Sequence, residues 1–497
     1  MNTIDAKMLD ELVAEVRAAG ALVRIAGEFR TPEATPSRTL EIRSPLSGEI
    51  VGEPTLAGVA DADAAGASAE RAFGVWAETA AEDRAGQLRA IAEDLSVASE
   101  SQEWPQLISE ETGKRLPEAK AELKLSATYF STFAELIMEQ QRELRHELVA
   151  GLTHKVHRRP RGVVAVMTPW NFPVSIPARK VAPAVASGCT VVFKPSEIGS
   201  VSSMVFAALV DRHLPPGVVN TVLGEPQDIS EPWLRRESVQ ALSFTGSTRV
   251  GKLVAASSTP RFLPSVLELG GCAPFVVLPD ADPRHAAETL MVAKFRNNGQ
   301  SCIAANQIFI AREIADDVLA HLSKSVRQMR VGDPRQETTD LGPMAPAGDP
   351  KRLRGLIESA VSHGAKVLAE GGELPEAGHY MEPALLVDVP EDAAVFREEI
   401  FGPVAAAQTF SDLNDVLRQH RQTGYGLAGY VCGRDLDQAE QVAGQLTAGI
   451  IGVNTGTPNH PRIPFGGLRS SGIGYEGAPA GLEIFQSQHT AAVGAGQ

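Results

Sequence analysis

Cysteine is scarce in this chain, with only 4 in 497 residues, and no two cysteines have CxxC spacing. This pattern argues against a disulfide framework and against a zinc site, so we expect reduced thiols and no bound metal. Long apolar runs are also missing, because uncharged stretches such as residues 181–193 are too short to cross a bilayer. The N-terminus has neither the apolar core nor the cleavage site of a secretion signal. The sequence predicts a cytoplasmic protein that does not contact a membrane.

Positive charge is low as well, with 46 Lys and Arg against 61 Asp and Glu and a net charge of −15. The few basic clusters, such as residues 157–161, are short, so we expect no nucleic-acid partner. A charged fraction of 22% and a hydrophobic fraction of 43% are typical of globular proteins. The length is that of two or three domains.

Helix-like and strand-like patterns divide the chain. Residues 61–138 are rich in Ala and have apolar residues at three- and four-residue spacing, which predicts a group of surface helices. From residue 162, short β-branched runs alternate with helical stretches, which predicts a parallel α/β sheet. These runs are GVVAVMTP, TVVFKPS, VVNTVLG, ALSFTGS, LELGG and APFVVLP. A second α/β series begins with the strand CIAANQIFIA and continues with helices near 313–330 and 351–363.

Residues 143–161 alternate in a strand-like way between the helical region and the first strand of the sheet. We favour a protruding hairpin that pairs with another subunit. A two-stranded excursion that folds back on its own domain is the alternative, and the sequence supports the two almost equally.

Two turns that follow predicted strands have residues suited to a dinucleotide. A parallel sheet binds ligands beyond the carboxyl ends of its strands. Lys194 and Glu197 in one turn can donate to and accept from ribose hydroxyls, and Gly246 and Ser247 in another can receive a pyrophosphate at a helix start. The Glu197 carboxylate would repel a 2′-phosphate, which favours NAD over NADP. The fingerprint GxGxxG is absent, so an ordinary strand-to-helix turn and a surface ion pair remain the alternatives.

A thiol and a carboxylate that could serve as its base carry the strongest chemical signal. Cys302 ends the glycine-containing segment GQSC, and Glu268 lies within LELGG. A thiolate is a strong nucleophile, and Asn171 offers a neutral amide that could hold an oxyanion. The pattern predicts covalent catalysis at an aldehyde carbon. The alternative for Cys302 alone is a small core residue.

Seven motifs in chain order make the whole sequence resemble the aldehyde dehydrogenase superfamily. They are TPWNFP (168–173), KPSE (194–197), FTGSTRVG (244–251), LELGG (267–271), GQSC (299–302), EEIFGPV (398–404) and PFGGLRSSGIGYEG (464–477). The resemblance implies an α/β fold with three parts that form a homodimer or homotetramer. These are a parallel-sheet dinucleotide-binding domain (1–142 and 162–268), an α/β catalytic domain (269–483) and a small β oligomerisation element (143–161 and 484–497).

The resemblance also implies a mechanism. Cys302 would attack the aldehyde, and Asn171 with the Cys302 backbone N–H would hold the oxyanion of the thiohemiacetal. Glu268 would activate the water that hydrolyses the thioester. Because members that transfer the acyl group to coenzyme A tend to lack this glutamate, a CoA-acylating enzyme is the lesser alternative. Lys180 and Glu476 resemble a pair that carries the proton outward, with a simple buried ion pair as the alternative.

The cofactor implied by the resemblance is NAD, with NADP as the alternative. Glu399 would bind the nicotinamide ribose, Phe401 would support the ring, and Ser247 would meet the pyrophosphate. The full set of cofactor residues is Thr168, Pro169, Trp170, Lys194, Ser196, Glu197, Gly246, Ser247, Leu269, Glu399 and Phe401.

The segments around Arg179 and Arg296 are similar to those of succinate-semialdehyde dehydrogenases. In that branch, arginines at these positions bind the distal carboxylate of the substrate, and the planar guanidinium suits a carboxylate. The resemblance therefore implies a semialdehyde such as succinate semialdehyde, with Phe465 and His460 completing the pocket. A general aliphatic or aromatic aldehyde is the alternative, in which case the arginines only balance local acids.

Some residues depart from that branch. Ala304 stands where many members carry a second cysteine, so we expect no redox switch of that type. His460 and Arg462 either add an anion contact or lie at the rim, and Cys272 either approaches the reactive thiol or is inert. A non-catalytic relative is a further alternative, but it would have no chemical reason to keep the nucleophile, the base and the oxyanion donor.

Overall fold

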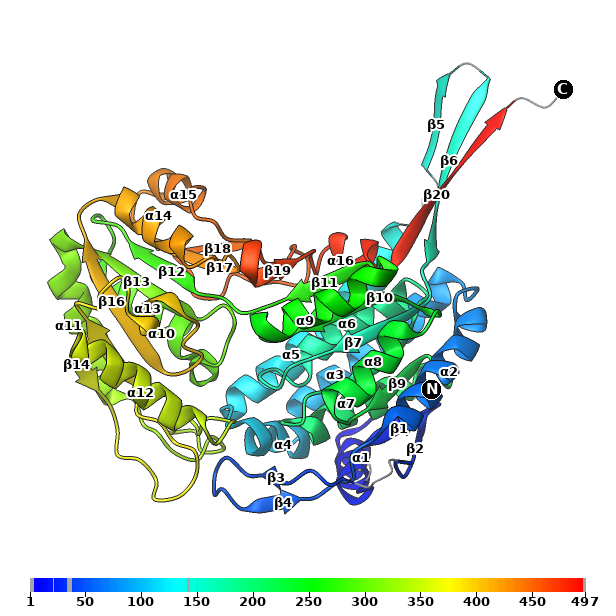
Figure 1. Ribbon diagram of the computed structural model, residues 1–497, viewed down its shortest axis with the longest axis horizontal. Coiled ribbons are helices and arrows are strands. Elements are labelled where there is room, and N and C mark those ends of the chain that lie inside the picture. The colour runs from blue at the N-terminus through cyan, green and yellow to red at the C-terminus, as the bar shows by residue number, and fades with distance from the viewer. Residues whose placement is uncertain (1–3, 21, 34–37, 141–143, 150, 495–497) are drawn as a thin grey trace.

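The computed structural model describes residues 4–20, 22–33, 38–140, 144–149 and 151–494, and Figure 1 shows their arrangement. Parts of three predicted segments lie outside the described residues. These parts are residues 1–3 at the N-terminus, Glu143 and Ala150 of the predicted hairpin, and residues 495–497 of the C-terminal tail.

Helices occupy the Ala-rich region, as the spacing of its apolar residues predicts. They follow a short N-terminal helix, α1 (Ala6–Ala18), and comprise α2 (Val59–Trp76), α3 (Ala81–Glu100), α4 (Glu103–Thr112) and α5 (Leu116–Glu139). Gly113 ends α4 in the left-handed conformation (φ 71°), and a proline lies in the first turn of α5. A left-handed glycine and an early proline are common helix boundaries, so the chain turns sharply between these two helices.

The first sheet has the strand order β19-β11-β10-β7-β8-β9-β1-β2. Its central strands are parallel, whereas β19 and β1 run antiparallel to their neighbours. The strands are β1 (Val23–Ile25), β2 (Glu28–Phe29), β7 (Val163–Met167), β8 (Thr190–Lys194), β9 (Val219–Val222), β10 (Val239–Thr245), β11 (Ser265–Glu268) and β19 (Gly472–Ile473). Five of the predicted β-branched runs form β7 to β11.

Helices cover both faces of this sheet. Val164 and Val166 of β7 pack into the core under α1 and α3 to α7, where α6 is Ser175–Ala186 and α7 is Ser200–Asp211. Val163 and Ala165 face the core under α2, α8 (Pro226–Arg235) and α9 (Thr248–Ser258). Burial on both faces explains why these runs are continuously apolar rather than alternating.

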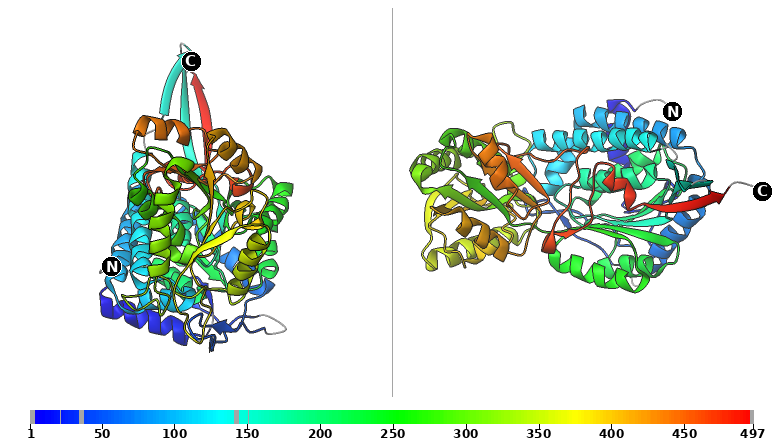
Figure 2. Two further views of the ribbon diagram at one scale, coloured as in Figure 1. Left: turned by 90° about the vertical axis from the view of Figure 1, so that its left-hand side faces the viewer. Right: turned by 90° about the horizontal axis from the view of Figure 1, so that it is seen from above.

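The second sheet has the order β14-β15-β16-β13-β12-β17-β18, and only β14 is antiparallel to its neighbour. Its strands are β12 (Ala273–Val277), β13 (Ala305–Ala311), β14 (Lys366–Glu370), β15 (Ala384–Val387), β16 (Val404–Phe410), β17 (Ala428–Cys432) and β18 (Ile450–Val453). The main helices around it are α10 (Pro283–Phe295), α11 (Ala315–Gln328), α12 (Asp349–Ser362), α14 (Leu413–Gln422) and α15 (Leu436–Ala443). The predicted second α/β series is therefore present, and the two sheets form separate lobes (Figures 1 and 2).

A three-stranded ribbon projects from the first lobe. The hairpin of β5 (Leu144–Val149) and β6 (Leu152–Pro160) pairs through β6 with β20 (Gln486–Gly494), so the predicted hairpin does protrude. Figures 1 and 2 show it standing clear of both lobes. Such exposed strand edges are ready to pair with another chain.

Across the described residues, we find no helix that is both long enough and apolar enough to span a membrane. The chain passes from the first lobe to the second at residues 269–272, between β11 and β12. This crossing places Glu268, the last residue of β11, at the boundary between the two sheets.

Candidate active site

The first sheet has a topological switch point between β7 and β10. The chain runs outward from β7 to β9 and then returns to β10 on the other side of β7. Ligands of open α/β sheets bind at the carboxyl ends of the strands at such a point. Thr168 and Pro169 follow β7 and Gly246 follows β10, so these predicted cofactor residues lie at the switch point.

The N-terminus of α9 lies beside this switch point. Ser247 is the N-cap residue, and its hydroxyl accepts a hydrogen bond from the Val250 N–H (3.3 Å). The free N–H groups and the positive dipole end of a helix attract phosphate. Leu269 packs close to this helix, since a Cβ on Gly251 would lie 2.3 Å from its side chain.

Lys194 and Glu197 form an ion pair at the carboxyl end of β8, with Nζ 2.7 Å from Oε1. The Lys194 side chain is 8% exposed and that of Glu197 is 37% exposed. Ser196, between them, accepts a hydrogen bond from the Ile198 N–H. A partly exposed carboxylate beside a lysine is suited to ribose hydroxyls.

Glu399 and Phe401 come from the second lobe and face the first. The Gly271 N–H donates to Glu399 Oε1 (3.1 Å), and burial raises the pKa of Glu399 to about 7. A Cβ on Gly270 would lie 2.6 Å from the other carboxylate oxygen, so a larger residue there would displace the Glu399 side chain. The Phe401 ring meets Trp170 edge to face at 5.6 Å. The chemistry of these groups fits a nicotinamide nucleoside held between the lobes.

The segment before Cys302 has an unusual backbone. Asn297 and Asn298 are both left-handed (φ 54° and 56°), a conformation that asparagine tolerates better than most residues. The Asn298 amide donates to the carbonyls of Gly113 and Pro343, and Asn297 donates to those of Asn171 and Gln300. These bonds join the loop to both lobes and hold the thiol in one place.

Cys302 is half-buried and lines a cavity of about 140 Å³. Burial raises the pKa of its thiol to about 12; Arg179 opposes this shift, whereas Glu399 and Glu268 add to it. The thiol is therefore protonated at neutral pH, and the half-buried sulfur must lose its proton to solvent before it attacks as the thiolate. Gly271 packs directly on the backbone of Cys302, because a Cβ there would lie 2.3 Å from the carbonyl oxygen.

A buried ion pair that the sequence did not single out positions Asn171. Lys114 and Glu122 are paired, and Lys114 Nζ also donates to the Asn171 carbonyl (3.0 Å). Glu122 accepts from the backbone N–H groups of Val174 and Ser175 (2.9 and 3.0 Å). Lys114 lies in the connection between α4 and α5 and Glu122 on the buried side of α5, so no shared local pattern marks the two as a pair.

Asn171 itself donates through Nδ2 to the Gln300 carbonyl (3.0 Å). Its amide has a second N–H, and its Oδ1 atom is buried without a hydrogen-bond partner. The amide lies in the same network as the loop that carries Cys302, as expected of an oxyanion donor.

Glu268 is 2% exposed, and neither of its carboxylate oxygens has a hydrogen-bond partner. Burial raises its pKa well above the usual value, and Glu476 raises it further, whereas Arg179 and Lys180 lower it. A raised carboxyl pKa is typical of a general base that operates near neutral pH.

Glu476 binds two cations. Lys180 Nζ lies 2.5 Å from Oε1 and also donates to the Ser243 hydroxyl, and Arg179 Nε lies 2.5 Å from Oε2. The predicted Lys180–Glu476 pair is thus present, and Arg179 also pairs with Glu476, as the alternative reading of this arginine as balancing a local acid expects. Burial and Arg179 lower the pKa of Lys180, whereas the Glu476 carboxylate opposes the shift.

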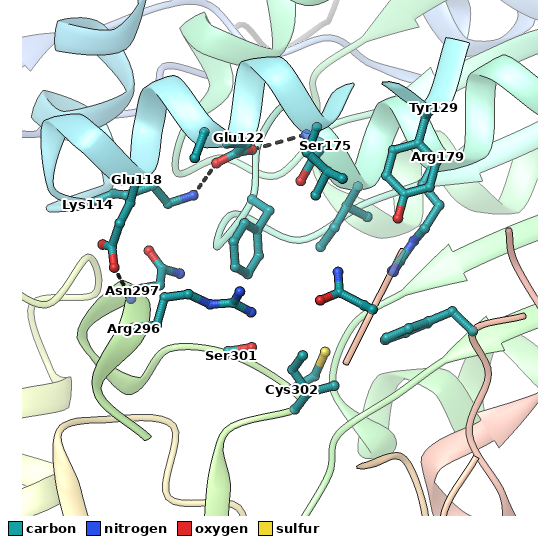
Figure 3. Close-up of a pocket in the computed structure, with 17 residues that line it drawn as sticks. Lys114, Glu118, Glu122, Tyr129, Ser175, Arg179, Arg296, Asn297, Ser301 and Cys302 are labelled. Carbon is teal, nitrogen blue, oxygen red and sulfur yellow. Dashed lines mark hydrogen bonds and ion pairs between the residues drawn. The ribbon is translucent and has the colours of Figure 1, made fainter. Parts of the chain in front are cut away.

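Arg179 and Arg296 lie on opposite sides of the cavity, with Cys302 at its base (Figure 3). The Arg179 guanidinium stacks on Phe465, 4.2 Å from the ring centroid. Arg296 has no carboxylate within ion-pair distance among the residues that the structure describes. Further lining residues that the sequence did not suggest are Lys114, Glu118, Glu122, Leu125, Tyr129, Phe172, Ser175, Ser301 and Asn459.

His460 is exposed and does not line this cavity, although the resemblance placed it in the substrate pocket. Its neighbour Asn459 lines the wall instead, because the loop turns the histidine away. Arg462 is paired with Glu135 at the surface. This loop has neither helix nor strand periodicity, so the sequence could not predict which residue points inward.

Cys272 is buried, and its sulfur accepts a hydrogen bond from the Asn306 amide (3.5 Å). Burial raises its pKa to about 12, which favours the inert alternative for this thiol. Among the residues described, we find no group of three His, Cys, Asp or Glu that could hold a metal ion.

The chain is similar to known proteins over almost its whole length. The model of the aldehyde dehydrogenase family matches residues 31–491. A glutarate-semialdehyde dehydrogenase of Pseudomonas putida is 36% identical, covering 91% of this chain and 94% of the relative. The NADP(+) succinate-semialdehyde dehydrogenase of Escherichia coli is 34% identical, covering 91% of this chain and 94% of the relative. The crystal structure of succinate-semialdehyde dehydrogenase from Burkholderia pseudomallei superimposes with a TM-score of 0.91 at 34% identity, covering 96% of this chain and 98% of that one.

Proposed function

Because the chain belongs to the aldehyde dehydrogenase family and is an NAD(P)-dependent enzyme that oxidises an aldehyde, we propose that its substrate is a semialdehyde with a terminal carboxylate. The observation that carries this proposal is the unpaired Arg296 guanidinium on the wall of the cavity that contains Cys302. Semialdehyde dehydrogenases among the relatives support it. A general aliphatic or aromatic aldehyde is the second candidate.

In the proposed reaction, the Cys302 thiol loses its proton to solvent, the thiolate Sγ forms a bond to the aldehyde carbon, and the carbonyl oxygen becomes an oxyanion. The Asn171 amide and the Cys302 backbone N–H stabilise this charge, an effect that is typically about a hundred- to a thousandfold in rate for one donor. A bound NAD(P) would supply the hydride acceptor, and loss of a hydride from the same carbon leaves a thioester on Cys302. Glu399, Phe401 and Trp170 would hold the nicotinamide nucleoside for this step.

Glu268 then removes a proton from the water that attacks the thioester, and the acid leaves with Cys302 as a thiol. Lys180 and Glu476 pass the proton away from the site. The raised pKa of Glu268 is consistent with a base that takes a proton and releases it again. Because Glu268 is present, the product is a free acid rather than a coenzyme A thioester.

Arg296 is the cation that we expect to receive the distal carboxylate of the substrate. In Arg296→Ala, the ratio of kcat/KM for succinate semialdehyde to that for butanal should fall roughly 50-fold, the loss expected for a hydrogen bond between charged groups. Initial rates of NADH formation with succinate semialdehyde, glutarate semialdehyde, butanal and benzaldehyde measure this ratio.

Arg284→Ala is the matched control, because this arginine lies on the exposed side of α10 and pairs only with Glu288. Its ratio of kcat/KM for succinate semialdehyde to that for butanal should equal that of the parent. A parent enzyme that prefers butanal or benzaldehyde would contradict the semialdehyde proposal and favour the second candidate.

Glu197 is the residue that we expect to set the cofactor preference. Its carboxylate should repel a 2′-phosphate by about 1–2 kcal/mol, so the parent should show a lower KM for NAD than for NADP. In Glu197→Gln, the KM for NADP should fall about tenfold relative to that for NAD. Equal constants for the two cofactors in the parent would refute the repulsion.

The assembly is proposed to be a homodimer or homotetramer, with the ribbon of β5, β6 and β20 as one contact. Exposed apolar residues on α9 and just after it, Leu253 (59%) and Phe262 (89%), offer a second contact. Free thiols at all four cysteines support a reducing, cytoplasmic location.

A further inference from the structure

Asn306 lies at the start of β13, shortly after Cys302, and its side chain binds a different segment of the second lobe. Its Nδ2 atom donates to the carbonyl of Glu398 (2.5 Å), and its Oδ1 atom accepts a hydrogen bond from the Ile400 N–H (3.4 Å). One amide therefore binds the backbone on both sides of Glu399. Asn306 is 1% exposed, so solvent does not compete for these bonds.

The segment that Asn306 binds has little regular structure of its own. Residues 398–403 lie between a short helix and β16 and belong to neither. Phe401 within it is left-handed (φ 50°), a strained conformation that persists only when the surroundings hold it. Arg352 of α12 donates to the Ile400 carbonyl (3.0 Å), but its side chain is 41% exposed. The buried amide of Asn306 is therefore a major anchor of this segment.

The same amide also contacts the residues beside the Glu399 carboxylate. Nδ2 of Asn306 donates to Cys272 Sγ (3.5 Å), and this thiol lies 3.8 Å from the Glu398 carbonyl. Cys272 directly follows Gly271, whose N–H donates to Glu399 Oε1 (3.1 Å). Both N–H groups and the oxygen of the amide are thus used. The backbone around Glu399 and its carboxylate are held by one buried cluster.

We infer that Asn306 is a positioning residue for the cofactor, because it fixes the backbone on both sides of Glu399 and so holds that carboxylate where the nicotinamide ribose would bind. This inference rests on the proposed role of Glu399. Asn306 does not line the cavity that contains Cys302. Its effect on NAD is exerted through the placement of Glu399.

The test is the Kd for NAD, measured by quenching of protein fluorescence in the absence of aldehyde. Asn306→Ala removes both backbone bonds, and the Kd should rise about tenfold, the change expected for the loss of about one hydrogen bond. Asn306→Ser keeps a hydroxyl that is too short to reach both backbone groups, so the rise should be about threefold. An unchanged Kd in Asn306→Ala would overturn the inference.

Asn454→Gly is the matched control. The Asn454 amide makes the same pair of backbone bonds in the same lobe, since it donates to the Gly433 carbonyl (2.8 Å) and accepts from the Gly433 N–H (3.1 Å). Neither residue belongs to the proposed cofactor set, and glycine suits the left-handed backbone of Asn454 (φ 54°). This variant should lower the Tm and leave the Kd for NAD unchanged. A raised Kd would mean that any loss of stability in this lobe weakens NAD binding, which would contradict a specific role for Asn306.

A double-mutant cycle tests whether Asn306 acts through Glu399. In the Glu399→Gln background, Asn306→Ala should change the Kd for NAD by less than about twofold, because the carboxylate that it positions is already lost. Independent, additive increases would overturn the inference while leaving the role of Glu399 intact. An unchanged Kd in Glu399→Gln alone would instead refute the proposed role of Glu399, and the inference with it. Asn306→Ser takes the place of Asn306→Ala in this cycle if the latter fails to fold.

Discussion

Replacing Cys302 with Ala should abolish NADH formation with every aldehyde, by at least about 10⁴-fold in kcat/KM, because no other group in the cavity can form the covalent adduct. The side chain makes no hydrogen bond that the fold needs, and Ala fits its place beside Gly271. Binding of NAD, measured by quenching of protein fluorescence, should remain, since the proposed cofactor residues are untouched.

Cys432→Ala is the matched control, because this cysteine is also free but is buried in β17. It should retain activity close to that of the parent. If Cys302→Ala kept a substantial fraction of the parental rate, the thiohemiacetal mechanism would be wrong for this chain.

Replacing Glu268 with Gln should separate the two halves of the reaction. Hydride transfer precedes the step that needs the base, so we expect a burst of NADH stoichiometric with active sites. Steady-state turnover should then fall by about 10²–10⁴-fold, the usual contribution of a general base. Rapid-mixing absorbance measures the burst, and intact-protein mass spectrometry measures the acyl group that accumulates on Cys302.

The pH dependence gives a second readout of the same variant. Burial and Glu476 raise the pKa of Glu268, so the carboxylate form increases as the pH rises, and parental turnover should rise with it. This rise should be absent in Glu268→Gln. Glu231→Gln, at the surface on α8, serves as the control. Loss of the burst together with turnover would mean that Glu268 acts before the thioester forms.

Local sequence determined the strands and the chemistry of the loops between them. The β-branched runs predicted β7 to β12 because each is short, apolar and followed by turn residues, and a parallel sheet buried on both faces requires that pattern. The same runs placed Thr168, Lys194 and Gly246 at strand ends, where a parallel sheet binds its ligands. The prediction that a loop thiol and a carboxylate act together likewise came from residue type and motif.

Tertiary structure alone decided which side chains meet. Lys114 lies 57 positions from Asn171 and occupies an ordinary helix boundary, so no local periodicity marks it as the group that holds the Asn171 loop. Glu476 lies 296 positions from Lys180, and its second cation, Arg179, was indistinguishable in sequence from a substrate ligand. Motifs specify the chemistry that each residue can perform. Arg179 has a buried counter-charge in Glu476, whereas Arg296 has no ion pair among the described residues, and this difference arises only because the fold brings segments that are distant in the sequence together.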